Sequence, residues 1–490
     1  MKAIEEIESF ESPDQTPFAH SYPEIRVNTL IEPINPLLHT PGSYIPRSAS
    51  AWDARGPREG GNPVNVKALG NIHAFIRKYD SKWPSLGNNI VRPVSKERIV
   101  VTGTTGALGS YLLSQLLKSD KVEKIWAMNR KSGSGNSKDR QIASFEDKLL
   151  DTSLLNCEKL VFVDANLVES KLGLSKELYD EISSEATIII HNAWEVNHSR
   201  DLKFFEPNIC GTRHLLDVAF NSIAPTGLPR FVFASSIAVA GLARPGRYLN
   251  ETSITLEDAA TSNGYGQSKA VTEKLLESAR HAGLSTCTVR IGQLTGDINS
   301  GSWSTTDWLP SIITSSISIG CLPGATGTVS WLPLDVAAHS IIDICLARAV
   351  EMPSVVHLCH PRPVPWMVIV GAFATCIFLR TGSQLPIVGF DEWNGRIKEA
   401  AESFEGSKAD RYKRFPTIKI QSVLDGAVKS EIRLRARRDS GHAEFTGVVR
   451  LDITIAKALS ETLRFTPELG MKHVERWFRY WDSVGFFKSV

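Results

Sequence analysis

The sequence predicts an α/β protein in which a doubly wound parallel sheet of the Rossmann type is followed by a smaller, mostly helical lobe. Strand-like apolar runs alternate with helical patterns between residues 98 and 358. A glycine-rich turn follows the first of these strands, and after about residue 361 the alternation stops and helical patterns dominate. Alternation over this length is typical of a parallel sheet that helices cover on both faces.

The N-terminal part differs from the rest in composition. Residues 1–60 are rich in Pro, Ser and Glu and show no sustained hydrophobic period, so we expect an irregular or disordered lead-in. The first ten residues are acidic and lack an apolar stretch, which argues against a signal peptide. Residues 61–96 are expected to form one short amphipathic helix, at 64–79, and a polar linker that contains proline.

The nucleotide-binding Rossmann domain is placed at 97–360, and the substrate lobe at 361–490 with contributions from 297–330. Strands are predicted from short apolar runs bounded by turn residues, and helices from apolar residues that recur every three or four positions. The expected strands cover 98–102, 124–128, 160–163, 187–191, 230–234, 285–291 and 355–358, and the helices between them include 205–220, 268–282 and 336–347.

Composition and charge exclude several classes of partner. The apolar fraction of 42% and the charged fraction of 22% are those of a soluble globular protein. A net charge of +2 creates no global field that would attract nucleic acid, and the longest apolar run, 365–379, is too short to cross a membrane. The seven cysteines contain no C-x-x-C pair, so we expect no disulfide framework, no metal site and a reducing, cytoplasmic setting.

The glycine-rich turn at residues 103–109 has the spacing G-x-x-G-x-x-G between a predicted strand and a predicted helix. Gly103 permits a tight turn, Gly106 lets the backbone approach a pyrophosphate, and Gly109 lets the helix lie close on the sheet. The phosphates then meet unpaired N–H groups at the helix N-terminus. We interpret this turn as a dinucleotide site; a purely structural turn is the alternative.

The end of the second predicted strand indicates which dinucleotide binds. NAD-binding folds usually place an acid there, which holds the ribose 2′-hydroxyl. This strand ends in Asn129-Arg130-Lys131, without an acid, and an arginine fork suits a 2′-phosphate. The pattern favours NADPH over NADH, the alternative being a solvent-facing basic turn.

Tyr265 and Lys269 lie four residues apart on a predicted helix, so their side chains share a face. A phenol, with a pKa of about 10, is a poor proton donor or acceptor at neutral pH, and a neighbouring ammonium is expected to lower that pKa. Ser236 lies at the carboxyl end of an earlier strand, where ligands bind in such sheets. A surface Tyr–Lys pair and a capping serine are the structural alternatives, but the order of glycine turn, serine and Tyr/Lys favours a catalytic set.

These motifs together are similar to those of the extended short-chain dehydrogenase/reductases, on residues 103–109, 191–193 and 208–212, Ser236, Tyr265 and Lys269. The sequence further resembles the thioester reductase domains that end fungal nonribosomal-peptide-synthetase-like and carboxylic acid reductases, on the stretches 101–110, 290–296, 308–310 and 331–335. The match is strong from about 97 to 366. It is looser toward the C-terminus, where 477–487 resembles the closing W-x-x-x-W-x-x-x-G-F segment of that family.

The resemblance implies a catalytic triad of Ser236, Tyr265 and Lys269. It also implies that Asn208 orders the active-site helix. Asn166 occupies a position where the family usually has Asp near the adenine, and Trp194 replaces a usual small residue and would narrow the nicotinamide side. Contacts with NADPH are implied for Gly103, Thr105, Gly106, Ala107, Leu108, Gly109, Arg130, Asn166, Leu167, Asn192, Ala193, Tyr265 and Lys269.

The implied reaction is hydride transfer from NADPH to a thioester carbonyl, with release of an aldehyde and a thiol; a second reduction to an alcohol stays open. Domains of this family normally follow a carrier domain whose serine bears phosphopantetheine, but no Asp-Ser pair here has that context. Residues 62–76 resemble only the end of a carrier domain. The substrate would therefore be an acyl thioester on a separate carrier protein or on coenzyme A, or a free carbonyl compound.

Two other functions stay open at this point. One is an extended reductase or epimerase that acts on a free carbonyl or sugar-nucleotide substrate. The other is a non-catalytic NADP sensor or scaffold that kept the fold. The helical closing lobe and the segments around Trp308 and Trp331 favour the thioester reductase over the first, and the retained Ser236, Tyr265 and Lys269 argue against the second.

Overall fold

The computed structural model describes residues 65–80, 82–84, 94–131, 136–224, 226–241, 248–347, 351–436 and 443–487. The irregular lead-in expected at 1–60 lies outside these ranges. The first described element is the amphipathic helix α1 (Val66–Tyr79), whose buried side carries Ala68 and Ile72. It packs on α7 (Gly264–His281) and agrees with the helix expected at 64–79.

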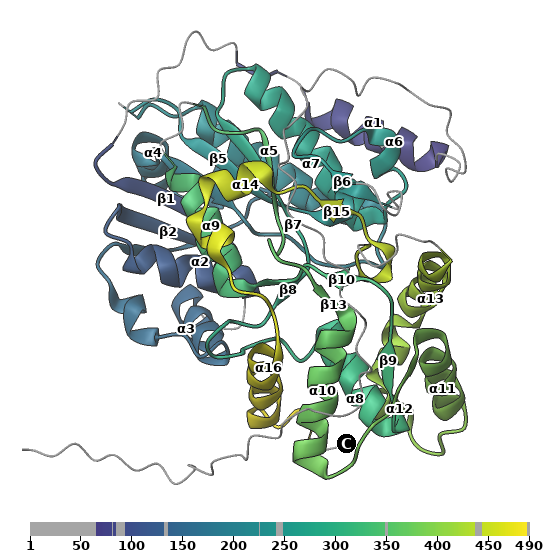
Figure 1. Ribbon diagram of the computed structural model, residues 1–490. Helices are drawn as coiled ribbons and strands as arrows, with labels where there is room; N and C mark the ends of the chain where they lie inside the picture. The colour runs from purple at the N-terminus through teal and green to yellow at the C-terminus, as the bar shows by residue number, and fades with distance from the viewer. Residues whose placement is uncertain are drawn as a thin grey trace, which may run out of the picture. The chain divides into compact units, whose positions relative to one another are not determined.

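Seven strands form the central sheet in the order β12-β7-β5-β4-β1-β2-β3 (Figure 1). Every neighbouring pair in it is parallel. The order along the chain reverses between β1 and β4, and such a switch point is where ligands bind in doubly wound sheets. The predicted fold class is confirmed. The strands are β1 (Glu97–Thr102), β2 (Val122–Arg130), β3 (Leu160–Ala165), β4 (Ile188–His191), β5 (Arg230–Ser236), β7 (Thr286–Ile291) and β12 (Val355–Leu358).

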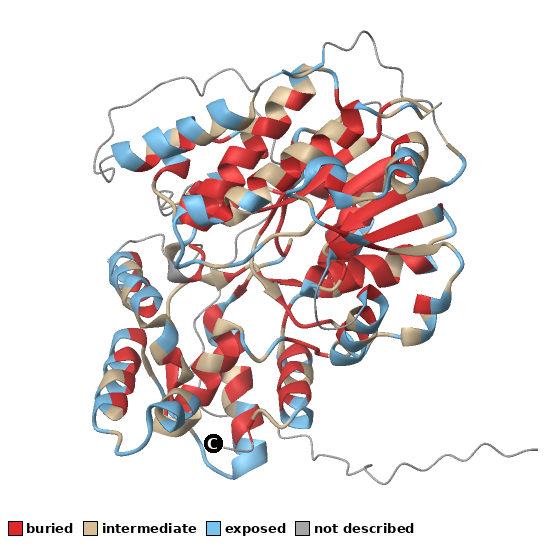
Figure 2. Cartoon of the chain, turned by 180° about the vertical axis from the view of Figure 1, so that it is seen from behind, coloured by how far each residue is buried: buried red, intermediate tan, exposed pale blue. Residues whose placement is uncertain are grey.

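Helices cover both faces of this sheet. In β1, Ile99 and Val101 point to one face and Val100 to the other, because successive side chains of a strand alternate. The first face packs against α2 (Ala107–Lys118) and α9 (Leu334–Leu346), and the second against α5 (Glu206–Phe220) and α7. Figure 2 shows the strands buried between these layers. Burial on both faces explains why the strands read as continuous apolar runs.

The C-terminal lobe has its own apolar core, in which the largest buried side chains are tryptophans. Each is at most 3% exposed: Trp303, Trp331, Trp366, Trp393, Trp477 and Trp481. The apolar run expected to be buried at 365–379 forms α10 (Trp366–Thr381), but only one side of it is covered, since Phe378 and Leu379 are exposed. The other helices of the lobe are α8 (Trp308–Ile319), α11 (Phe390–Glu402), α12 (Lys408–Arg414), α13 (Gln421–Arg435) and α16 (Met471–Ser483).

Residues 450–465 return from this lobe to the Rossmann domain (Figure 1). β15 (Arg450–Leu451) pairs with β6 (Tyr248–Leu249), α14 (Thr454–Leu459) packs on β12 and α9, and α15 (Glu461–Phe465) packs on α9. The buried carboxylate of Glu251 accepts hydrogen bonds from the backbone N–H groups of His357 and Ala456, both at 3.0 Å. These bonds tie the returning segment to the edge of the sheet.

The remaining elements connect these layers. They are α3 (Ser137–Asp147), α4 (Lys176–Glu185), α6 (Leu256–Ala259), β8 (Leu294–Thr295), β9 (Leu322–Gly324), β10 (Thr328–Val329), β11 (Leu332–Pro333), β13 (Val364–Pro365) and β14 (Ile387–Gly389). Within the ranges that the structure describes, none of the helices has the length and apolar character needed to cross a bilayer.

Candidate active site

A cavity of about 750 Å³ lies at the carboxyl ends of β1, β2, β4 and β5, at the switch point of the sheet. Parallel strands end at the same edge, so this edge gathers residues that are far apart in the sequence. Gly109 does not line the cavity. The predicted site residues that do line it are Gly103, Thr105, Gly106, Ala107, Leu108, Arg130, Asn166, Leu167, Asn192, Ala193, Ser236, Tyr265 and Lys269.

The glycine turn between β1 and α2 has the shape of a phosphate cradle. Gly103 has φ +74°, and a Cβ there would lie 2.8 Å from the Ala193 Cα. A Cβ on Gly109 would lie 2.0 Å from the Gly103 carbonyl oxygen, so glycine is required for α2 to approach the turn. At Gly106 the nearest atom would be 3.4 Å away, and no side chain caps α2. The first turn of α2 is therefore open toward the cavity, which fits a dinucleotide pyrophosphate.

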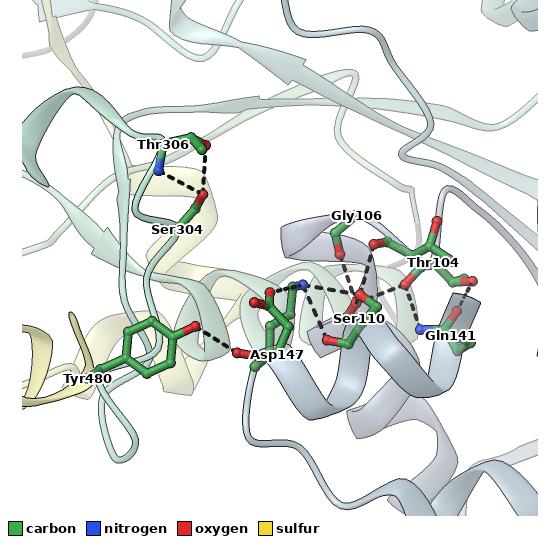
Figure 3. Close-up of polar contacts among 11 residues, drawn as sticks. Thr104, Gly106, Ser110, Gln141, Asp147, Ser304, Thr306 and Tyr480 are labelled. Carbon is green, nitrogen blue, oxygen red and sulfur yellow. Dashed lines mark hydrogen bonds and ion pairs between the residues drawn. The ribbon is translucent and has the colours of Figure 1, made fainter. Parts of the chain in front are cut away.

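Buried polar side chains form hydrogen bonds that fix the conformation of this turn (Figure 3). Thr104 Oγ1 donates to Gln141 Oε1 at 2.7 Å, and Gln141 Nε2 donates back to the Thr104 carbonyl at 2.9 Å. Ser110 Oγ donates to the carbonyl of Gly106 at 2.9 Å.

Figure 3 also shows a contact between the C-terminal lobe and the Rossmann domain. The hydroxyl of Tyr480, on α16, donates to the Asp147 carbonyl of α3 at 2.7 Å.

The residues that follow β4 form hydrogen bonds with the end of β1 and with the glycine turn. Thr102 Oγ1 accepts hydrogen bonds from the backbone N–H groups of Asn192 and Ala193, at 3.1 and 3.0 Å. Asn192 Nδ2 donates to the Gly103 carbonyl at 3.3 Å. Asn192 and Ala193 thus fix the geometry of the glycine turn in addition to lining the cavity.

Two arginines lie at the β2 end of the cavity. Arg130 is the last residue of β2 and is exposed. Arg140, on α3, also lines the cavity, and its Nη2 donates to the Arg130 carbonyl at 2.7 Å and lies 3.4 Å from Asp164 Oδ1. Sequence reasoning missed Arg140; the available signal was a second arginine on the helix that follows the basic turn. β2 is longer than the expected 124–128, so Asn129 and Arg130 belong to the strand itself.

Asn166 lines the cavity with an amide that is already engaged in its own turn. Its Nδ2 donates to Glu169 Oε1 at 2.7 Å, and its Oδ1 accepts from the Val168 N–H at 3.3 Å.

Leu167, the next residue, packs closely on α5, because a Cβ on Gly211 of α5 would lie 2.8 Å from the Leu167 Cβ. The Asn208 carbonyl, also on α5, accepts from Thr212 Oγ1 at 3.0 Å, while the Asn208 side chain lines the cavity.

Tyr265 is placed beside Ser236 by glycines at the start of α7. Asn263 caps this helix, its side chain accepting from the Gly266 N–H at 3.0 Å. A Cβ on Gly266 would lie 2.3 Å from the Ala238 carbonyl oxygen, so glycine allows α7 to approach the segment that follows Ser236. Tyr265 is 8% exposed, and its phenol lies close enough to the Ser236 side chain for the two to interact.

The pKa of Tyr265 differs from the sequence-based expectation. Burial raises the pKa of the phenol to about 12, and the hydrogen bond with Ser236 opposes this rise. Lys269 does not lower it, because burial disfavours the charged form of its amine; the Lys269 Nζ lies 5.8 Å from the centre of the Tyr265 ring and donates to the Ala234 carbonyl at 2.6 Å. The expected lowering of the pKa is therefore wrong.

We expect almost no Tyr265 phenolate at pH 10, where a phenol with the usual pKa of 10.0 is half ionised. The measurement is an ultraviolet absorbance titration of the wild type minus that of Tyr265→Phe, in which the signals of the other tyrosines cancel. A difference signal that reaches half its amplitude at or below pH 10 would contradict the raised pKa.

Lys269 is buried in an aromatic surrounding. Its Nζ lies 4.1 Å from the ring centre of Trp194 and 4.5 Å from that of Phe233. Burial holds the pKa of the Lys269 ammonium well below its usual range, and the Glu273 carboxylate partly opposes this. Lys269 nevertheless lines the cavity together with Tyr265.

A buried ion pair lies in the core next to the candidate catalytic residues. Arg290 Nη2 and Glu273 Oε2 are 2.7 Å apart, with side chains that are 0% and 6% exposed. Glu273 also accepts a hydrogen bond from Ser235 Oγ at 2.5 Å, and Arg290 donates to the Thr252 carbonyl at 2.9 Å. The pair connects α7 and β7 to the end of β5, and so it supports Ser236 and Lys269 from within the core.

The described residues contain no group of three or more His, Cys, Asp and Glu side chains that could hold a metal ion. The seven cysteines are free thiols. The candidate site is thus built from a glycine turn, two arginines, Ser236, Tyr265 and Lys269. A Rossmann sheet with this set at its switch point defines an oxidoreductase of the extended short-chain dehydrogenase/reductase class, with a site for a nicotinamide cofactor.

Comparison with known proteins gives the family. Residues 101–341 match the NAD-binding family described as Male sterility protein. The chain is 38% identical over 79% of its length to the adenylate-forming reductase Nps11 of Serpula lacrymans, and 36% identical over 88% to Nps10 of Heterobasidion annosum. It is 32% identical over 85% of its length to a carboxylic acid reductase of Neurospora crassa. The chain is homologous to these reductases over most of its own length, and it spans 35%, 39% and 38% of the length of these relatives.

Solved structures share the fold. The terminal R domain from the myxalamid PKS-NRPS biosynthetic pathway matches with a TM-score of 0.67 and 22% identity, over 86% of this chain and 99% of that one. The reductase domain of a nonribosomal peptide synthetase from Mycobacterium tuberculosis matches with a TM-score of 0.61 and 18% identity, over 86% and 97%. UDP-glucuronic acid 4-epimerase from Bacillus cereus matches less well, with a TM-score of 0.51 and 13% identity, over 79% and 99%.

Proposed function

We propose that the protein is an NADPH-dependent thioester reductase of secondary metabolism, which releases an acyl group from a carrier protein or from coenzyme A as an aldehyde. The observation that carries the proposal is the convergence of Ser236, Tyr265 and Lys269 with the glycine turn in one cavity. The similarity to adenylate-forming and carboxylic acid reductases supports it, as does the fold shared with terminal reductase domains.

Ser236 and Tyr265 act on the substrate carbonyl in this mechanism. When bound, the reduced nicotinamide supplies a hydride to the carbonyl carbon. The Ser236 and Tyr265 hydroxyls donate hydrogen bonds to the carbonyl oxygen, on which negative charge develops. Tyr265 then transfers its proton to that oxygen, since the phenol is protonated at neutral pH. The resulting hemithioacetal loses its thiol and leaves an aldehyde.

The arginines at the end of β2 support the choice of NADPH. Arg130 and Arg140 both line the cavity at this end, and a guanidinium binds a phosphate with charge-assisted hydrogen bonds. No acid ends β2, where NAD-binding folds hold the 2′-hydroxyl. The nearby acid, Asp164, is already engaged by protein groups. Its Oδ1 lies 3.4 Å from Arg140 Nη2 and accepts a hydrogen bond from Ser137 Oγ.

Replacing Arg130 by Ala is expected to weaken NADPH binding by about ten-fold or more, because a hydrogen bond to a charged group contributes roughly 1.5–3 kcal/mol. NADH, which lacks the 2′-phosphate, should bind the variant and the wild type alike. Titration calorimetry gives both dissociation constants. Lys131→Ala is the matched control, since this neighbouring cation is exposed and does not line the cavity. Unchanged NADPH affinity in Arg130→Ala, or better turnover of the wild type with NADH, would contradict the assignment.

The competing function is an extended reductase or epimerase that acts on a free carbonyl compound. The match to UDP-glucuronic acid 4-epimerase is the observation that favours it. Purified protein is assayed with NADPH against acyl-coenzyme A thioesters, carrier-bound thioesters, free ketones and sugar nucleotides, with products identified by mass spectrometry. Aldehyde formation from a thioester supports the proposal, and turnover of ketones or sugar nucleotides alone would refute it.

A further inference from the structure

Trp194 lies in the cavity beside Lys269, at a position where its ring is close to the catalytic residues. It follows β4 by three residues and lines the cavity. Its ring centre is 4.1 Å from Lys269 Nζ and 5.4 Å from the Phe233 ring, which it meets edge to face. Phe233 is fully buried, whereas Trp194 lines the cavity, so of the two rings that contact the Lys269 amine only the indole belongs to the cavity lining.

The indole N–H of Trp194 has no acceptor. Its Nε1 atom is buried and lacks a hydrogen-bond partner among the described residues. Leaving such a donor unpaired costs about 1–3 kcal/mol, and buried tryptophans usually avoid that cost. Trp477 shares this property, but it belongs to the core of the lobe and does not line the cavity. Indole N–H groups that do find an acceptor belong to Trp83, Trp126, Trp303, Trp308, Trp366, Trp393 and Trp481.

The order of the strands indicates which part of a dinucleotide meets this N–H. Arg130 ends β2, the glycine turn follows β1, Trp194 follows β4 and Ser236 ends β5. A dinucleotide that lies along the edge β2-β1-β4-β5 would therefore have its 2′-phosphate at β2, its pyrophosphate at β1 and its nicotinamide end at β4 and β5. Trp194 is on the same side of the glycine turn as Tyr265, where the nicotinamide riboside must lie for hydride transfer.

We propose that Trp194 is a further cofactor-binding residue, whose Nε1–H donates a hydrogen bond to an oxygen of the nicotinamide-riboside half of the cofactor while its ring shields the Lys269 amine from water. The inference rests on the proposed function, because it needs a cofactor in this cavity. It assigns a role to a side chain that replaces the small residue implied by the family resemblance.

The test compares two ligands that differ in the nicotinamide half. Titration calorimetry measures the dissociation constants of NADP⁺ and of adenosine 2′,5′-bisphosphate for the wild type and for Trp194→Phe, which keeps a ring over Lys269 but lacks the N–H. We expect NADP⁺ binding to weaken by roughly two- to ten-fold, the range of one hydrogen bond. Binding of the bisphosphate should not change, which also shows that the variant is folded. Trp83→Phe, which removes an indole N–H outside the cavity, is the control.

Each other outcome has a defined meaning. Unchanged or tighter NADP⁺ binding by Trp194→Phe would overturn the inference, since the indole would then be neutral or an obstruction. An equal loss for both ligands would overturn it as well, because it would indicate a general distortion of the site. If the wild type bound neither ligand, the proposed function would fail and this inference with it, whereas the first two outcomes leave the proposed function intact.

Discussion

Tyr265→Phe is expected to lower kcat for thioester reduction by about 10²–10⁴-fold, the usual contribution of a positioned general acid. The substitution removes one hydroxyl and keeps the buried ring. The loss should appear in kcat because the hydroxyl acts on the oxygen that becomes charged in the transition state. The dissociation constant of NADPH should change little, since the phenyl ring still fills the same space.

Stopped-flow measurement of NADPH oxidation, together with calorimetric binding, separates these two effects. Tyr179→Phe is the matched control, because that tyrosine lies on α4 and does not line the cavity. Wild-type turnover in Tyr265→Phe would refute the catalytic assignment. An inactive wild type that still binds NADPH would favour a sensor over an enzyme.

Arg290→Met is expected to lower the free energy of unfolding by about 3–5 kcal/mol, because removing one partner of a buried ion pair leaves the other charge uncompensated. Arg290 is fully buried and contacts Glu273 at 2.7 Å, the Thr252 carbonyl at 2.9 Å and His357 Nε2 at 3.3 Å. All these groups lose a donor in the variant, and Met cannot replace it. Since Glu273 also binds Ser235, the loss should extend to the end of β5 that carries Ser236.

Urea-induced unfolding measures this change, with Arg396→Met as the control. Arg396 and Glu392 form an ion pair at the same distance of 2.7 Å, but their side chains are 48% and 51% exposed. An exposed pair contributes about 0–1 kcal/mol, so the control should cost little. Similar losses in the two variants would show that burial does not decide the stability contribution of the Arg290–Glu273 pair.

The fold class could be predicted because it depends on local pattern. Parallel strands buried on both faces read as apolar runs, and the helices between them have apolar stripes, so the alternation is visible without knowing which strands are neighbours. The placement of Ser236 and Tyr265 at one cavity follows from the same logic, since parallel strands end at one edge of the sheet and the helix that leads to the next strand begins at that edge. The end of the helical lobe was less predictable, because the return of residues 450–465 to the sheet depends on pairing between β15 and β6, which are far apart in the sequence.

The sequence by itself determined the Rossmann fold, the glycine turn, the basic end of β2 and the Ser, Tyr and Lys that share the cavity, because each is encoded by residue types at fixed spacing along one segment. Only the tertiary structure decided that Arg140 lies beside Arg130, that Lys269 binds the Ala234 carbonyl under Trp194, and that burial raises the pKa of Tyr265. These properties depend on which side chains from distant segments pack together and on how much water they exclude. Neither this packing nor the exclusion of water can be read from the spacing of residues along the chain.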